Sequence, residues 1–240
     1  MNTIKVDLQD VKMVAHRGVS GLEMENTASA FVAAGNRSYF GVECDIHVTA
    51  DKKIVVIHDS NTGRVALDGE SVVVEEHTLD EIRQIRLKNL KGDDRGDLII
   101  PTLAEYVGIC KHYGKVCVIE LKERFETEDI KLVIKEINSL DYLENVIFIS
   151  FSWENMVDLR TLLPNQAMQF LCGAVTDELI QKLNRYSMDF DVRHTGLSKK
   201  EVELIHKNGH KINCWTVDDP DRAKELAEWG VDYITSNILE

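Results

Sequence analysis

The sequence has no long apolar segment. Its apolar runs are short, whereas a helix needs ~20 consecutive apolar residues to cross a bilayer. The opening stretch, MNTIKVDLQD, lacks the apolar region of a signal peptide. We therefore expect a cytoplasmic protein without stable membrane insertion.

Cysteine pairs and positive charge are also scarce. The five cysteines are scattered without a CxxC pair, so we expect reduced, buried thiols rather than a disulfide framework. A net charge of −13 argues against nucleic-acid partners, because such binding needs clustered Lys and Arg. An anionic substrate would need a bound metal or focused basic side chains.

Strand-like and helix-like segments alternate along the whole chain. Eight parallel strands with crossover helices favour an α/β fold, the (β/α)8 TIM barrel. An open doubly wound sheet is the alternative, but the turn HRGVSG does not fit GxGxxG. The expected strands are residues 11–15, 40–48, 116–121, 146–150, 167–171, 188–192, 211–216 and 232–235. The expected helices are residues 26–36, 102–113, 128–139, 154–163, 176–185, 199–208 and 220–229.

One connection is too long for an ordinary barrel loop. Residues 59–101 join the second and third barrel strands and carry their own short apolar segments. We interpret residues from about 60 to 100 as a small insertion. A chain of 240 residues is consistent with one barrel domain over residues 1–240.

Polar clusters stand where short apolar runs end. His16-Arg17, Glu43-Cys44-Asp45, His58-Asp59 and Glu120-Leu121-Lys122 all occupy such positions. Residues i and i+2 of a strand share a face, so Glu43 pairs with Asp45 and Glu120 with Lys122. Barrel enzymes place their sites at the carboxyl ends of the strands, so these side chains should meet at one mouth.

The residue types suit phosphoester chemistry. Three carboxylates can hold a hard cation such as Mg²⁺ or Ca²⁺. His16 and His58 could be Zn²⁺ ligands, but they serve better as acid and base on opposite sides of phosphorus. Arg17 offers a planar fork to phosphate oxygens and Lys122 a point charge.

These motifs together resemble the glycerophosphodiester phosphodiesterases, over about residues 11–237. The resemblance implies a TIM barrel with a small insertion, a divalent cation, and hydrolysis of glycerophosphodiesters to glycerol 3-phosphate and an alcohol. The motifs that carry it are His16-Arg17-Gly18, Glu25-Asn26-Thr27, Glu43-x-Asp45, Thr49-x-Asp51, His58-Asp59, Pro101-Thr102-Leu103, Glu120-x-Lys122 and Trp215-Thr216-Val217.

The resemblance also implies roles for single residues and a cofactor. The cofactor would be one divalent cation, Mg²⁺ or Ca²⁺, with Mn²⁺ as a further option, and the partner a small-molecule glycerophosphodiester. The roles of the two His residues, and water or the glycerol 2-hydroxyl as attacker, stay open. The implied residues are His16 and His58 for catalysis, Glu43, Asp45 and Glu120 for the metal, and Arg17, Lys122 and Trp215 for the substrate.

The chain departs from the family pattern near its end. Thr235-Ser236-Asn237 replaces the usual Thr-Asp, so the last strand should contribute differently to the site. Asp191, Arg193 and His194 have no family role, and we interpret them as salt-bridged rim residues. Two alternatives remain. One is a lysophospholipase D or phospholipase C-like enzyme on the same barrel, and the other is a non-enzymatic phosphate-metabolite-binding barrel.

Overall fold

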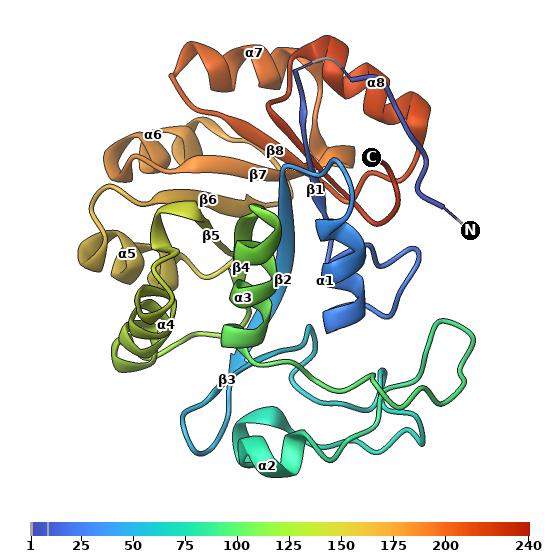
Figure 1. Cartoon of the computed structure of the whole chain (residues 1–240). Helices are drawn as coiled ribbons and strands as arrows, with labels where there is room; N and C mark the ends of the chain where they lie inside the picture. Colours follow the sequence, from blue (N-terminus) through green and yellow to red (C-terminus); the bar gives the residue numbers. More distant parts are fainter. Residues whose placement is uncertain (1, 9) are drawn as a thin grey trace.

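The computed structural model, which describes residues 2–8 and 10–240, confirms the TIM barrel. Eight parallel strands run in the order β1-β2-β4-β5-β6-β7-β8-β9, and pairing of β1 with both β2 and β9 closes the barrel. Helices surround it (Figure 1). The strands are β1 (Lys12–Ala15), β2 (Gly41–Val48), β3 (Ile54–Val56), β4 (Val116–Leu121), β5 (Val146–Ser150), β6 (Ala167–Cys172), β7 (Asp189–Arg193), β8 (Ile212–Trp215) and β9 (Tyr233–Ser236).

The helices connect successive strands, as the alternating pattern predicts. Helix α1 begins at Ala28, two residues later than expected, because Asn26 has φ 54° and Thr27 caps the first turn. The α-helices are α1 (Ala28–Gly35), α2 (Leu79–Ile82), α3 (Leu103–Tyr113), α4 (Thr127–Ser139), α5 (Trp153–Leu162), α6 (Asp177–Tyr186), α7 (Lys199–Lys207) and α8 (Pro220–Trp229).

The period of two along each strand separates two environments. On β2, Cys44 and Ile46 pack in the layer between barrel and helices. A second cluster of buried apolar side chains, which includes Val14, Val118 and Ile149, is formed by other strands of the barrel. Glu43 and Asp45 alternate with Cys44 and Ile46, so they point away from the helix layer. This alternation places charged groups inside the barrel, where they need polar partners.

The insertion between β3 and α3 has its own small core. Its segment contains the short helices η1 (Val74–Glu76) and α2 and projects from one end of the barrel (Figure 1). Val55 on β3, which pairs antiparallel with β2, joins this core. Met24 from the β1–α1 loop packs into it as well. The insertion is therefore attached to the loop that follows His16 and Arg17.

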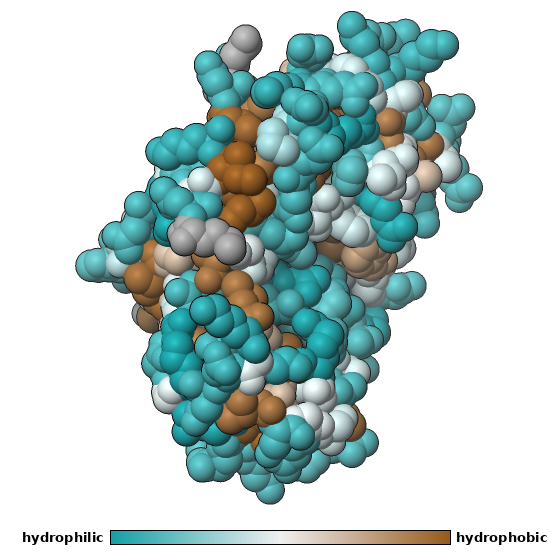
Figure 2. All heavy atoms as spheres, turned by 90° about the vertical axis from the view of Figure 1, so that its right-hand side faces the viewer, coloured by the Kyte–Doolittle hydropathy of each residue, from teal (hydrophilic) through white to brown (hydrophobic). Residues whose placement is uncertain are grey.

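One face of the molecule is mainly hydrophilic. Figure 2 shows this face, with apolar residues in patches between hydrophilic ones. Over the described residues, no helix is both long and apolar enough to span a membrane. The exposed large apolar side chains are Ile4, Val32, Val73, Leu90 and Phe151.

Candidate active site

Three carboxylates meet inside the barrel mouth. Parallel pairing of β2 with β4 sets Asp45 opposite Glu120, and Glu43 lies on the same face two residues earlier. One ligand atom from each lies within 4.8 Å of the others. All three side chains are buried. Strand register therefore brings together carboxylates from β2 and β4 that lie far apart in the sequence.

Each carboxylate of the cluster has an oxygen that is available to bind a cation. One buried oxygen of each carboxylate makes no hydrogen bond within the described residues: Glu43 Oε1, Asp45 Oδ1 and Glu120 Oε1. Buried polar atoms are normally paired, and carboxylate oxygens are the ligands that Mg²⁺ and Ca²⁺ take. The donor set fits a hard divalent cation.

Two basic side chains border the cluster. Arg17 Nε lies 3.2 Å from Asp45 Oδ2, and Arg17 Nη1 donates to Glu25 Oε1 at 2.9 Å. Lys122 Nζ lies 2.9 Å from Glu120 Oε1, an ion pair without hydrogen-bond geometry, and 3.6 Å from Asp45 Oδ1. Arg17 Nη2 takes part in neither the Asp45 contact nor the Glu25 contact. Both basic groups can therefore also bind an anion in the mouth.

A tight turn after β1 aims Arg17 at the cluster. Arg17 and Gly18 have positive φ values of 54° and 76°. The Arg17 N–H donates to Glu43 Oε2 at 2.7 Å. At Gly18 a Cβ would stand 2.6 Å from Ala30, so glycine is needed there both for conformation and for space.

The electrostatics divide the three carboxylates. Burial and the neighbouring Asp45 raise the pKa of Glu43 well above its usual range. Burial and Asp45 likewise raise the pKa of Glu120 to about 8. Burial acts upward on Asp45 too, but Arg17 and Lys122 outweigh it and hold its pKa at about 2. Without a cation, the cluster therefore keeps at least one proton at neutral pH.

His16 is held in one tautomer. Its Nδ1 lies 2.7 Å from Asn237 Oδ1. The Asn237 amide donates from Nδ2 to Asp218 Oδ2 at 2.6 Å, which fixes Oδ1 as the acceptor toward His16. Nδ1 therefore carries the proton and Nε2 offers a lone pair. Burial, and then Arg17, lower the pKa of His16, so the ring is neutral at neutral pH.

His58 is oriented from two sides. Its Nδ1 lies 2.6 Å from Asp59 Oδ1, and a carboxylate can only accept, so Nδ1 carries a proton. The His47 Nε2 lies 3.2 Å from the His58 carbonyl oxygen. Asp59 in turn accepts from Arg64 Nε at 2.6 Å. His58 is thus connected to the insertion through Arg64.

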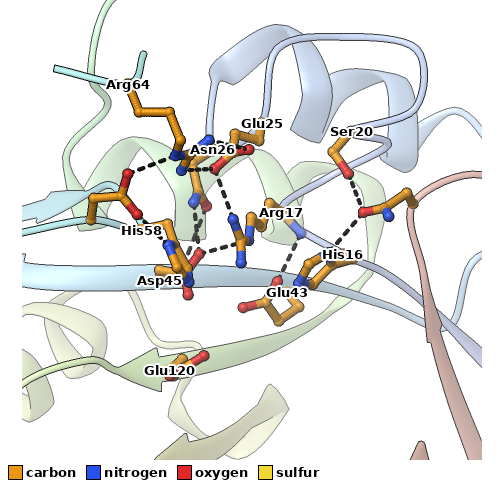
Figure 3. Close-up of polar contacts among 12 residues, drawn as sticks. His16, Arg17, Ser20, Glu25, Asn26, Glu43, Asp45, His58, Arg64 and Glu120 are labelled. Carbon is orange, nitrogen blue, oxygen red and sulfur yellow. Dashed lines mark hydrogen bonds and ion pairs between the residues drawn. The ribbon is translucent and has the colours of Figure 1, made fainter. Parts of the chain in front are cut away.

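A network of polar contacts crosses the mouth from His58 through Arg64 and Glu25 to Arg17 and Asp45 (Figure 3). Arg64 donates to both oxygens of Glu25, at 3.0 and 2.8 Å, and Glu25 also binds Arg17. The Asn26 amide donates to Asp45 Oδ2 at 2.8 Å. Thr27 accepts from the Ala30 N–H at the start of α1. Each residue of the Glu25-Asn26-Thr27 motif therefore has a separate structural task.

A cavity of about 100 Å³ joins these groups. Seven of the eight predicted site residues line it, and the eighth, Asp45, lies in the carboxylate cluster beside it. The predicted residues in its lining are His16, Arg17, Glu43, His58, Glu120, Lys122 and Trp215.

Comparison with known proteins identifies the family of this chain. The model of the glycerophosphoryl diester phosphodiesterase family matches residues 16–239. The chain belongs to this family. A glycerophosphodiester phosphodiesterase of Caldanaerobacter subterraneus subsp. tengcongensis is 30% identical over 234 residues, which are 95% of this chain and 94% of the relative. Family membership makes the chain a phosphoric diester hydrolase.

Solved structures share the fold. A phosphodiesterase of Oleispira antarctica, in complex with the product sn-glycerol-3-phosphate, superposes with a TM-score of 0.86 at 24% identity, covering 95% of this chain and 93% of that one. A Thermotoga maritima glycerophosphodiester phosphodiesterase gives 0.76 at 23% identity, with 95% of each chain covered. At these identities the likeness shows the barrel alone.

Sequence analysis misplaced one residue of this phosphodiesterase. The interpretation of Asp191 as a salt-bridged rim residue is wrong, because its side chain is buried and lines the cavity. Burial raises the pKa of Asp191 well above its usual range, and Glu120 acts in the same direction. Arg193 and His194 make no ion pair among the described residues either: Arg193 lies over the Trp215 ring, 5.3 Å from its centroid, and the His194 carbonyl oxygen accepts from Arg222.

Several contributors to the site were missed. Arg64, in the insertion, had no assigned role, although Glu25-Asn26-Thr27 and His58-Asp59 contained its partners. Asn237 was noted only as a departure from the family, yet it contacts His16. A lone Arg in a polar loop carries no sequence signal that distinguishes it from a solvated charge.

Proposed function

We propose that the protein hydrolyses glycerophosphodiesters to glycerol 3-phosphate and an alcohol with a divalent cation and a His pair. The observation that carries this proposal is the shared cavity. Two His residues with proton-bearing Nδ1 atoms, two basic side chains and a three-carboxylate cluster all adjoin it. That the Oleispira phosphodiesterase binds sn-glycerol-3-phosphate supports the substrate class.

Glu43, Asp45 and Glu120 would hold the cation, which we propose to be Mg²⁺ or Ca²⁺, with Mn²⁺ as a further option. When bound, such an ion neutralises phosphate charge and acts as a Lewis acid. Arg17 and Lys122 would bind phosphate oxygens from the same side and stabilise the charge that develops on them. A carboxylate cluster without these bases would repel the substrate.

His16 is the better candidate for the general base. Its neutral ring and free Nε2 can accept a proton from the attacking oxygen, which is water or the 2-hydroxyl of glycerol. His58, whose Nδ1 is anchored by Asp59, would then protonate the leaving alkoxide from Nε2. The Arg64 bridge would hold Asp59, and through it His58, at a fixed distance from Arg17.

The proposed function is tested with a panel of glycerophosphodiesters incubated with the metal-loaded protein. We expect release of glycerol 3-phosphate from each diester. A matched sample with Asp45→Asn should release none. Absence of glycerol 3-phosphate from every diester, with Mg²⁺, Ca²⁺ and Mn²⁺ each supplied, would refute the proposal.

Exchanging Asp218 and Asn237 should shift the pH profile. The double variant Asp218→Asn/Asn237→Asp keeps the hydrogen bond between the two side chains but places a carboxylate beside His16 Nδ1. A carboxylate there raises the pKa of His16, so the base stays protonated to higher pH. The acid limb of kcat/KM should move upward by about 1 pH unit or more.

Asp218→Asn alone is the control for this exchange, since it removes charge without altering the partner of His16. Its acid limb should move less than that of the double variant. If the limb stays in place in the double variant, His16 is not the base.

Trp215→Ala should weaken all headgroups together. The Trp215 ring lines the cavity and packs edge-on against Phe151 at 5.6 Å between centroids. We expect the glycerol to be gripped within the barrel and the alcohol to project beneath the insertion. Choline, ethanolamine and glycerol headgroups should therefore differ by less than about tenfold in kcat/KM, or ~1.4 kcal/mol.

The measurement is kcat/KM over this headgroup series for wild type, Trp215→Ala and Trp215→Phe, which keeps an aromatic ring. A wild-type preference above about a hundredfold, or a Trp215→Ala effect on one headgroup only, contradicts this arrangement. The single domain over residues 1–240, the cytoplasmic location and the absence of nucleic-acid partners stay predictions.

A further inference from the structure

Asp191 occupies the side of the cavity opposite the phosphate-binding groups. It lies on β7, which is four strands away from β2 in either direction around the barrel. Its side chain is buried, with 2% of the residue exposed, and it lines the same cavity as His16 and Glu120. A substrate that fills this cavity would therefore contact Asp191.

This carboxylate lacks the partners that the other buried acids have. Asp45 contacts Arg17, Lys122 and Asn26. Asp191 makes no ion pair in the part of the chain that the structure describes, and its Oδ1 accepts no hydrogen bond there. Its neighbour across the strand pair is the neutral Asn213 amide. Burial raises the pKa of Asp191 more than a hydrogen bond from Asn213 lowers it, and leaving the buried Oδ1 without a donor costs free energy.

Asp191 stands apart from the carboxylate cluster. Among the described residues, the group whose ligand atoms lie within 4.8 Å comprises Glu43, Asp45 and Glu120, without Asp191. A shared cation therefore does not explain it. In its ionised form Asp191 would also repel the phosphate, since like charges repel at short range.

The class of ligand that remains for Asp191 is a neutral hydrogen-bond donor. Trp215 Nε1 donates to the Asp191 backbone carbonyl oxygen at 3.2 Å, which holds the indole beside this residue, and both residues line the cavity. An apolar ring next to an acceptor matches a polyol, which presents C–H and O–H groups. In a glycerophosphodiester, the donor of the glycerol that lies farthest from phosphorus is its terminal hydroxyl.

We propose that Asp191 accepts a hydrogen bond from the terminal hydroxyl of the substrate's glycerol and thereby selects glycerol on this side of the phosphate. This inference rests on the proposed function and makes Asp191 a specificity-determining residue. It assigns the recognised end of the substrate to the acid on β7 and leaves the alcohol end to the insertion side.

The test compares two diesters that share one headgroup, glycerophosphocholine and an analogue in which hydrogen replaces the terminal hydroxyl of glycerol. Both keep the 2-hydroxyl, so either attacking oxygen remains available. Wild type should favour the glycerol diester by about 10- to 100-fold in kcat/KM, the range of a hydrogen bond to a charged group. Asp191→Leu should reduce that ratio to less than about threefold.

Asp191→Asn keeps one acceptor oxygen and should give an intermediate ratio. The ratio does not depend on the fraction of folded enzyme, so partial misfolding of a variant cannot imitate the effect. Asp189→Asn is the matched control, because it makes the same change two residues earlier, where Asp189 Oδ1 accepts from the Lys211 N–H. Its ratio should equal that of wild type.

Three results overturn the inference. An unchanged ratio in Asp191→Leu does so while leaving the proposed function intact, as long as wild type releases glycerol 3-phosphate. A change in preference between choline and glycerol headgroups, without a change in the terminal-hydroxyl ratio, assigns Asp191 to the alcohol instead. Loss of bound Mn²⁺ from Asp191→Leu would make it a metal ligand. Failure of wild type on both diesters removes the proposed function itself.

Discussion

Replacing either His16 or His58 by alanine is expected to lower kcat by ~10²–10⁴-fold, the usual contribution of a positioned acid or base. Both rings lie at the cavity with Nδ1 engaged by a neighbour. The fold should persist, since neither ring belongs to a hydrophobic core cluster. Circular dichroism and thermal melting check the fold, and steady-state kinetics check the loss.

The two variants should differ in one respect. A substrate with a strongly acidic leaving group, such as a p-nitrophenyl ester of glycerol phosphate, needs no proton on departure. It should restore turnover to His58→Ala but not to His16→Ala. The double variant should lose less than the product of the single losses, because the residues act as a unit.

His112→Ala is a suitable control for these experiments, because His112 is exposed on α3 away from the cavity. Its kcat should match wild type. The assignment of the His pair is wrong if neither His16→Ala nor His58→Ala changes kcat by more than about threefold.

Removing the cation is expected to abolish turnover and to lower the melting temperature, with Mg²⁺, Mn²⁺ or Ca²⁺ restoring both. The reason is the three-carboxylate cluster, in which one oxygen of each group is buried and makes no hydrogen bond with the described part of the chain. Glu43→Gln and Asp45→Asn should lose activity irreversibly. Full turnover by metal-stripped enzyme in excess chelator would contradict this prediction.

The pH dependence of stability offers a second measurement on the stripped protein. Folding raises the pKa of Glu120 from 4.5 to about 8. Between these values the folded protein keeps a proton that the unfolded chain has released, so stability falls as pH rises through this window. Saturating Mg²⁺ should flatten the slope, since the cation takes the place of the proton. Equal slopes with and without Mg²⁺ would argue against binding at this cluster.

Local sequence patterns predicted most of the fold. The alternation of short apolar strands with helices, and the period of two within Glu43-Cys44-Asp45, predicted both the barrel and the faces of β2. Capping residues in the sequence located the starts of helices well, because capping depends only on neighbouring residues. Thr102, for example, caps α3 through a hydrogen bond with a residue of the first turn. The site residues followed because motifs at strand ends converge in any parallel barrel.

The sequence by itself identified the barrel, the candidate metal carboxylates, the candidate catalytic His pair and the family resemblance. Each of these depends on residues close together in the chain or on a repeated unit. Tertiary structure alone decided which distant side chains meet. Strand register set Asp45 opposite Glu120, and packing of the insertion brought Arg64 to Glu25. Asp191 illustrates the physical reason: a carboxylate near a strand end is equally compatible with rim and interior. Only the closure of the barrel decides which of the two it faces.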